Sequence, residues 1–206
     1  MATRRCRRWK RKRPDRRNGG AMPGLKGSFF IAVLAGAAAV MGWAAYQRFA
    51  HPPLSQAISM KPLADGVWVS EQIGPPQLAL LRQQRFATVV DLRPDGEVAA
   101  QPSSSDMADA AGRAGLAFSY VPVPHGAIPD GAVNALQKAL ASEPRPVLLY
   151  CRSGRRAART WALAEASRPG GLDARAIRKV VLDVGQPVDD LGAEIQARIA
   201  ARPRAG

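Results

Sequence analysis

A short apolar segment, Val147-Leu148-Leu149-Tyr150, runs directly into Cys151-Arg152-Ser153-Gly154-Arg155-Arg156, and Ala-rich sequence of helical character follows. This order predicts a buried strand, a tight loop and a helix, which together point backbone N–H groups at an anion. Gly154 lets the backbone turn with a positive φ and approach a ligand closely. We therefore predict a phosphate-binding loop that contains Arg152, Ser153, Gly154 and Arg155.

Cys151 and Arg156 are the predicted reactive residues of this loop. The N–H dipoles, the start of the helix and the nearby guanidinium groups all favour the thiolate of Cys151 over its thiol. Arg156 follows five residues later and can fold back to bind two oxygens of a phosphate or sulfate group. We predict Cys151 as a nucleophile and Arg156 as the oxyanion-binding residue, whereas Arg152 and Arg155 could equally be solvated surface charges.

Strands and helices alternate along the chain after residue 60. Strands are expected at 67–69, 88–92, 118–121 and 147–150, and helices at 76–84, 106–114, 129–141, 156–167, 173–182 and 188–200. This alternation predicts an α/β three-layer sandwich with a central, mostly parallel sheet. The segment from Arg202 to Gly206 is expected to be a frayed tail.

The N-terminal part has a different composition. An uncharged run of eighteen residues, Phe29 to Tyr46, is long enough for one transmembrane helix, although the apolar region of a signal peptide is the alternative. We favour the anchor because the run exceeds the usual signal and carries aromatic residues near its end. The expected organisation is a basic cytoplasmic tail (1–28), a transmembrane anchor or uncleaved signal (29–47), a Pro-containing linker (48–59) and an α/β domain (60–201).

Charge predicts the orientation of this anchor. Eleven of the 30 Lys and Arg residues and one acidic residue precede Ser28, so this segment carries +10 of the net +14. Such a block is retained in the cytoplasm, which predicts a single-pass protein of the bacterial inner membrane with its α/β domain in the periplasm. Met22 is an alternative start that keeps this orientation with less charge. No nucleic-acid partner is expected, because the rest of the chain is only weakly basic.

The chain offers no spacing for a metal site or an internal disulfide. Cys6 and Cys151 would lie on opposite sides of the membrane, and His51 and His125 are isolated from other ligand residues. We therefore expect neither a metal nor a cofactor.

Several motifs resemble the phosphatase-like domain of the bacterial β-lactamase-hydrolase-like protein family. The resemblance covers most of the chain from about Met60 to Leu191. Its motifs are Leu63 to Ser70, Val90 to Glu97, Gln101-Pro102, Val121 to Val123, Tyr150 to Gly154, Arg156 and Trp161 to Leu163. The resemblance implies a cysteine-phosphatase-like fold with Cys151 as nucleophile and Arg156 as oxyanion binder.

The sequence departs from most tyrosine phosphatases around the cysteine. Those enzymes have His before the cysteine, five residues between Cys and Arg, and then Ser or Thr, whereas this chain has Tyr150, four residues and Ala157. The shorter loop resembles that of rhodanese-type sulfurtransferases. The general acid is open among His125, which follows Val121 to Pro124, Asp130 a few residues later, and Asp95 in another loop, although Asp95-Gly96 is also a common turn.

The leading hypothesis is a cysteine-dependent phosphatase-like hydrolase that acts on phosphate monoesters and resembles protein tyrosine phosphatases. A rhodanese-type sulfurtransferase that carries a persulfide on Cys151 is the first alternative, so the substrate bears phosphate or sulfur. The second is a non-catalytic, membrane-tethered module that binds anions. The oligomeric state is not predicted.

Reporter fusions after Pro53 test the N-in, C-out topology. We expect alkaline phosphatase to be active there and a fluorescent protein that matures only in the cytoplasm to stay dark. The reverse pattern would place the domain in the cytosol, and recovery of a shortened soluble chain would mean that the segment is a cleaved signal.

Overall fold

The computed structural model describes Gly36, residues 40–43 and residues 58–203. Gly36 and residues 40–43 are helical, and the remainder of the expected anchor, like the basic tail, lies outside the described residues. Among the residues described, no helix is both long and apolar enough to cross a membrane. The chain divides into two units, 1–53 and 54–206, and the second contains the α/β domain.

The domain is built on a five-stranded sheet with the order β1-β2-β5-β3-β4. Its strands are β1 (Met60–Pro62), β2 (Val67–Ser70), β3 (Thr88–Asp91), β4 (Ala117–Tyr120) and β5 (Val147–Tyr150). The pairs β2·β5, β5·β3 and β3·β4 are parallel, and only β1 is antiparallel to its neighbour. Every residue of β3 and β5 is buried, because helices cover both faces of the sheet.

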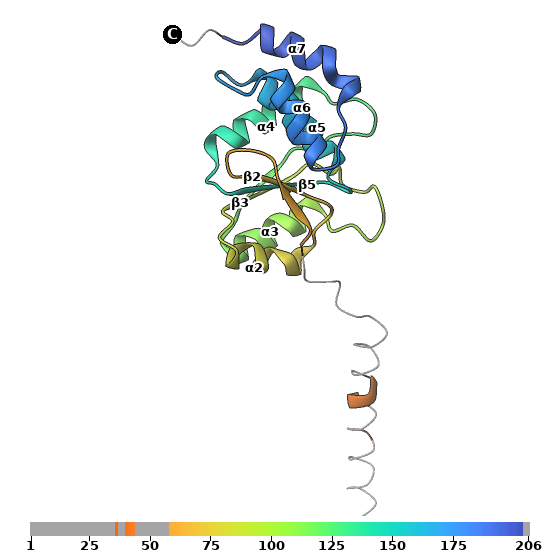
Figure 1. Ribbon diagram of the computed structural model, residues 1–206. Helices are drawn as coiled ribbons and strands as arrows, with labels where there is room; N and C mark the ends of the chain where they lie inside the picture. Colours follow the sequence, from red (N-terminus) through yellow and green to blue (C-terminus); the bar gives the residue numbers. More distant parts are fainter. Residues whose placement is uncertain (1–35, 37–39, 44–57, 204–206) are drawn as a thin grey trace, which may run out of the picture. The chain divides into compact units, whose positions relative to one another are not determined.

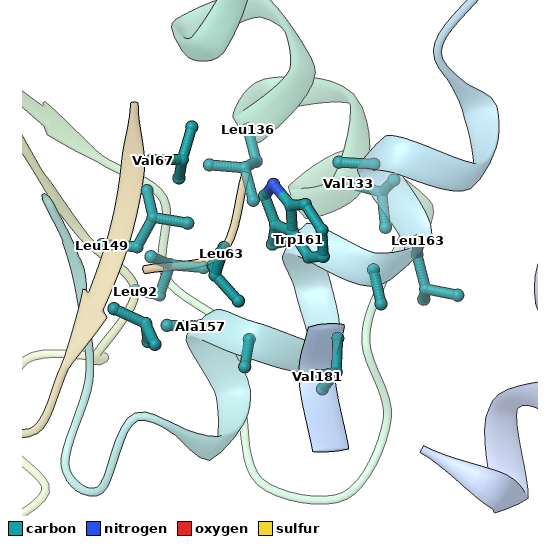
Figure 2. Close-up of a cluster of buried hydrophobic side chains, with 14 of the residues drawn as sticks. Leu63, Val67, Leu92, Val133, Leu136, Leu149, Ala157, Trp161, Leu163 and Val181 are labelled. Carbon is teal, nitrogen blue, oxygen red and sulfur yellow. The ribbon is translucent and has the colours of Figure 1, made fainter. Parts of the chain in front are cut away.

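Two helical layers complete the sandwich (Figure 1). The first contains α2 (Pro75–Gln83) and α3 (Ser104–Ala114), which pack with Leu148 and Tyr150 in one core. The second contains α4 (Asp130–Ser142), α5 (Arg155–Ser167), α6 (Ala174–Asp183), the 3₁₀ turn η1 (Asp189–Leu191) and α7 (Gly192–Ala200). This second core is centred on Trp161 and includes Leu149 (Figure 2). The mixed α/β sheet and its helices agree with the predicted fold class.

Helix α5 is the most deeply buried helix of the described domain. All its residues from Ala157 to Ala166 are buried, and it contacts α4, α6 and α7. Its many Ala side chains let neighbouring helices approach closely. Arg159 is buried there and forms a two-pronged pair with Asp190, at 2.8 and 2.5 Å, which fixes α5 to η1.

The expectation of a frayed tail after Ala201 is wrong for Arg202. Its guanidinium group donates to the carbonyl oxygens of Glu165, Ala166, Gly171 and Leu172 at 2.7 to 2.9 Å. The first two acceptors belong to the last turn of α5, whose carbonyls have no partners within the helix. Arg202 therefore caps α5 from a position outside any helix.

Replacement of Arg202 by Lys should lower domain stability, because a single ammonium group cannot reach four carbonyl oxygens. We expect a loss of about 1–3 kcal/mol, measured as a lower urea midpoint. Arg175→Lys, at an exposed position of α6, is the matched control and should change little. Equal midpoints for the two variants would contradict the capping role.

Candidate active site

The carboxyl ends of the four parallel strands meet at one edge of the sheet. In the register of the sheet, Tyr150 is opposite both Ser70 and Asp91, and Asp91 is opposite Tyr120. The loops that follow these strands are therefore neighbours, which is where parallel α/β sheets usually bind ligands. They bring together segments of the chain up to about 80 residues apart in sequence.

The loop after β5 holds Cys151 at its base. Cys151 is 1% exposed, and Gly154 adopts a φ of +78° as the N-cap residue of α5. A Cβ atom at Gly154 would lie 3.3 Å from the carbonyl oxygen of Ser70, so the glycine also permits close packing. The backbone N–H of Gln72 donates to the carbonyl oxygen of Arg152, and the side chain of Gln186 donates to the carbonyl oxygen of Ser153. The loop is thus held from two sides.

Six consecutive N–H groups of this loop and helix start have no protein acceptor. Within residues 58–203, the N–H groups of residues 152–157 donate to no carbonyl or side-chain oxygen, and the first bond of α5 is that of Ala158 to Gly154 at 2.9 Å. Unpaired N–H groups at the start of a helix attract anions. The geometry therefore provides donors for an oxyanion beside Cys151.

The two neighbouring arginines at the start of α5 point in different directions. Arg155, like Arg152, is exposed. The Arg156 side chain is 12% exposed and donates to both carboxylate oxygens of Glu97, at 2.6 and 2.9 Å, and to the carbonyl oxygen of Val123 at 2.8 Å. Burial opposes its charge, but the bond to Glu97 and the charges of Cys151 and Glu97 raise the pKa of Arg156.

Glu97 connects three loops of the site. Its carboxylate accepts from Arg156 and from Nε of Arg93 at 2.8 Å, and Nε2 of His125 lies 3.3 Å away. The bond to Arg156 is the main reason that the pKa of Glu97 falls from 4.5 to about 2, although burial acts in the opposite direction. Glu97 was not identified as a site residue from the sequence, although it ends the Val90 to Glu97 motif.

Asp91 and Arg93 support this group from the end of β3. Asp91 is 1% exposed and accepts the backbone N–H of Arg93 at 2.8 Å, and burial is the main cause of the rise in its pKa to about 6. Arg93 is also buried and donates to Gln72 at 2.9 Å as well as to Glu97. Both residues therefore form structural pairs that hold the loop after β3.

Asp130, one of the three candidate acids, pairs with Arg198 of α7. The other two occupy different environments. The carboxylate of Asp95 accepts the N–H of Ser104 at 2.7 Å and its hydroxyl at 2.6 Å, so it is bound to the first residue of α3. The His125 side chain is 72% exposed and contacts Glu97. Of the two, only His125 has a contact with the Glu97–Arg156 pair. Among the described residues, no cluster of three or more His, Cys, Asp or Glu side chains has the form of a metal site.

Comparison with known proteins places this geometry in a family. The family model of the beta-lactamase hydrolase-like protein, phosphatase-like domain, matches residues 59–168. The beta-lactamase hydrolase-like protein of Agrobacterium fabrum is 34% identical over 116 residues, which are 55% of this chain and 26% of that protein. The chain thus spans about a quarter of the length of this curated relative.

Solved phosphatase structures share the fold. A candidate phosphatase from Neisseria meningitidis is 22% identical, with a TM-score of 0.58 over 66% of this chain and 96% of that one. Kinase-associated phosphatase is 12% identical, with a TM-score of 0.56 over 71% of this chain and 97% of that one. Because the family model matches more than half of the chain, the protein belongs to the family of the beta-lactamase hydrolase-like protein, phosphatase-like domain.

Proposed function

We propose that this domain hydrolyses phosphate monoesters through Cys151, in the manner of a protein tyrosine phosphatase. One observation carries the proposal: Cys151 lies at the base of a loop in which six N–H groups have no acceptor within residues 58–203, with the Arg156 guanidinium group turned inward beside it. Membership of a phosphatase-like family supports the same reaction class.

The reaction follows from these positions. The sulfur of Cys151 attacks phosphorus, the bond from phosphorus to the ester oxygen breaks, and the leaving oxygen takes a proton. The free N–H groups and Arg156 stabilise the negative charge on the remaining oxygens in the transition state. Water then attacks the phosphocysteine, releasing inorganic phosphate and restoring the thiolate.

His125 is the proposed donor of the proton to the leaving oxygen. Its exposed ring reaches the Glu97–Arg156 pair, and Glu97 can stabilise the protonated imidazole at 3.3 Å. Asp95 is the weaker candidate, because both of its carboxylate oxygens are occupied by Ser104.

A sulfurtransferase is the second candidate, and two features of the loop favour it. Only four residues separate Cys151 from Arg156, and the next residue, Ala157, offers no hydroxyl group to assist departure of the thiolate from phosphocysteine. In this reaction Cys151 would attack the outer sulfur of thiosulfate, release sulfite and retain a persulfide.

We also propose, from the basic block before Ser28 alone, that either reaction takes place on the periplasmic side of the membrane.

Mass spectrometry of Cys151 separates these functions. After brief exposure of the full chain to an aryl phosphate and acid quenching, we expect a phosphoryl adduct of about 80 Da that Cys151→Ser lacks. An adduct of about 32 Da after thiosulfate, without the phosphoryl adduct, would identify the sulfurtransferase instead. Binding of phosphate with neither adduct would indicate the non-catalytic anion-binding module.

Glu97→Gln should reduce turnover of an aryl phosphate roughly ten- to a hundredfold, because Arg156 loses the carboxylate that fixes the orientation of its guanidinium group. Most of this loss should appear in kcat and in the affinity for vanadate. Glu194→Gln removes a comparable partner of Arg198 on α7 and serves as the matched control. Equal effects of the two substitutions would show that Glu97 does not position Arg156.

The stability difference between the native chain and Glu97→Gln should depend on pH. The pKa of Glu97 is lowered from 4.5 to about 2, so its contribution is complete above pH 4.5 and disappears as the pH falls through about 2. The urea midpoints of the native chain and Glu97→Gln should therefore differ at pH 6 and converge near pH 2. A constant difference over this range would assign the effect to packing rather than to charge.

A further inference from the structure

A pocket of about 440 Å³ lies at the other edge of the sheet, away from the Cys151 loop. Its lining includes Val67, the first residue of β2, Arg145, which precedes β5 by two residues, and Arg168, which ends α5. The Cys151 loop, in contrast, follows the carboxyl ends of these strands. The volume is typical of sites for small molecules, which occupy roughly 300–1,000 Å³.

Trp161 presents an unused hydrogen-bond donor to this pocket. The side chain is 1% exposed, and in the part of the chain that the structure describes its indole N–H donates to no protein acceptor. Protein atoms do not fully enclose the indole nitrogen. Because Trp161 lines the pocket, the nitrogen is accessible from there. Figure 2 shows it on the side of the ring that faces Leu136 and Val67. A buried indole N–H normally has an acceptor, which here must come from outside the protein.

Arg145 supplies a guanidinium group without a carboxylate partner among residues 58–203 at the same pocket. This group donates to the backbone carbonyl oxygens of Asp65 and Leu140. Arg168, by contrast, pairs with Glu165 at 2.6 Å and with Asp65 at 3.4 Å, and both of these acidic residues also line the pocket. The pocket floor is apolar and includes Val67, Leu140 and Trp161. Apolar side chains beside a guanidinium group that has no carboxylate partner suit a small amphipathic anion.

We propose that this pocket binds a small carboxylate with an aromatic or aliphatic body. The body packs on Trp161 and Leu140, an oxygen accepts from the indole N–H, and the carboxylate pairs with Arg145. The site is independent of the reaction at Cys151, because no residue of the Cys151 loop contributes to it.

A titration of the ¹⁵N-labelled full chain with 4-phenylbutyrate tests the proposal. We expect a saturable shift of the indole N–H resonance of Trp161, which Trp161→Phe identifies by its disappearance. Ala141→Phe places a large side chain at the pocket rim and should weaken binding at least roughly tenfold. Ala135→Phe, at an exposed position of α4 outside the pocket, is the matched control and should bind normally.

Two comparisons separate charge from simple hydrophobic contact. The neutral analogue 4-phenylbutyramide should bind several-fold more weakly than the carboxylate, and Arg145→Gln should abolish this preference. Cys151→Ser should leave binding unchanged, so failure of the proposed hydrolysis would not affect this test. Absence of a saturable shift, equal weakening by Ala135→Phe, or equal binding of acid and amide would overturn the proposal.

Discussion

The site depends on one buried carboxylate that is shared by two arginines. Glu97 is 12% exposed and receives hydrogen bonds from Arg93 and Arg156, whose side chains are 5% and 12% exposed. Burial of three charged groups is costly unless each has close partners, and the two-pronged contact with Arg156 meets this condition. The group still carries one more positive than negative charge. This excess favours an anionic ligand in the loop around Cys151.

The shared carboxylate also determines how the loops are placed. Glu97 belongs to the loop after β3, Arg156 to the helix after β5, and Val123 and His125 to the loop after β4. The parallel register brings these loops to one edge, but strand pairing alone does not fix their side chains. The Glu97–Arg156 pair and the bond from Arg156 to the Val123 carbonyl oxygen provide that restraint. Loss of Glu97 would leave the guanidinium group of Arg156 without its counterion, whereas loss of Arg156 would leave Glu97 paired with Arg93 alone.

The sequence predicts elements whose signals are local and misses contacts between residues that are far apart in the chain. The strand at Val147–Tyr150 and the helix after it were predictable, because apolar runs and helical periodicity are local signals. Strand β1 was missed, since Met60–Pro62 is short, largely exposed and paired only at an edge. Glu97 was missed because its main partner, Arg156, is 59 residues away and pairs with it only once the sheet has formed. The same reason applies to Arg202, whose acceptors are 30 to 37 residues earlier.

The two ends of α5 differ in whether their unpaired backbone groups find partners, and this difference supports the proposal that the loop before α5 is a binding site. A helix leaves N–H groups unpaired at its start and carbonyl groups unpaired at its end. At the end of α5, Arg202 caps two of the last carbonyls, although it must cross from beyond α7 to do so. At the start, the described residues supply no comparable acceptor for the N–H groups of residues 152–157, and the only carboxylate in contact with Arg156 is already engaged by its guanidinium group. The proposed phosphate ligand would supply the acceptors that these N–H groups lack within the described residues.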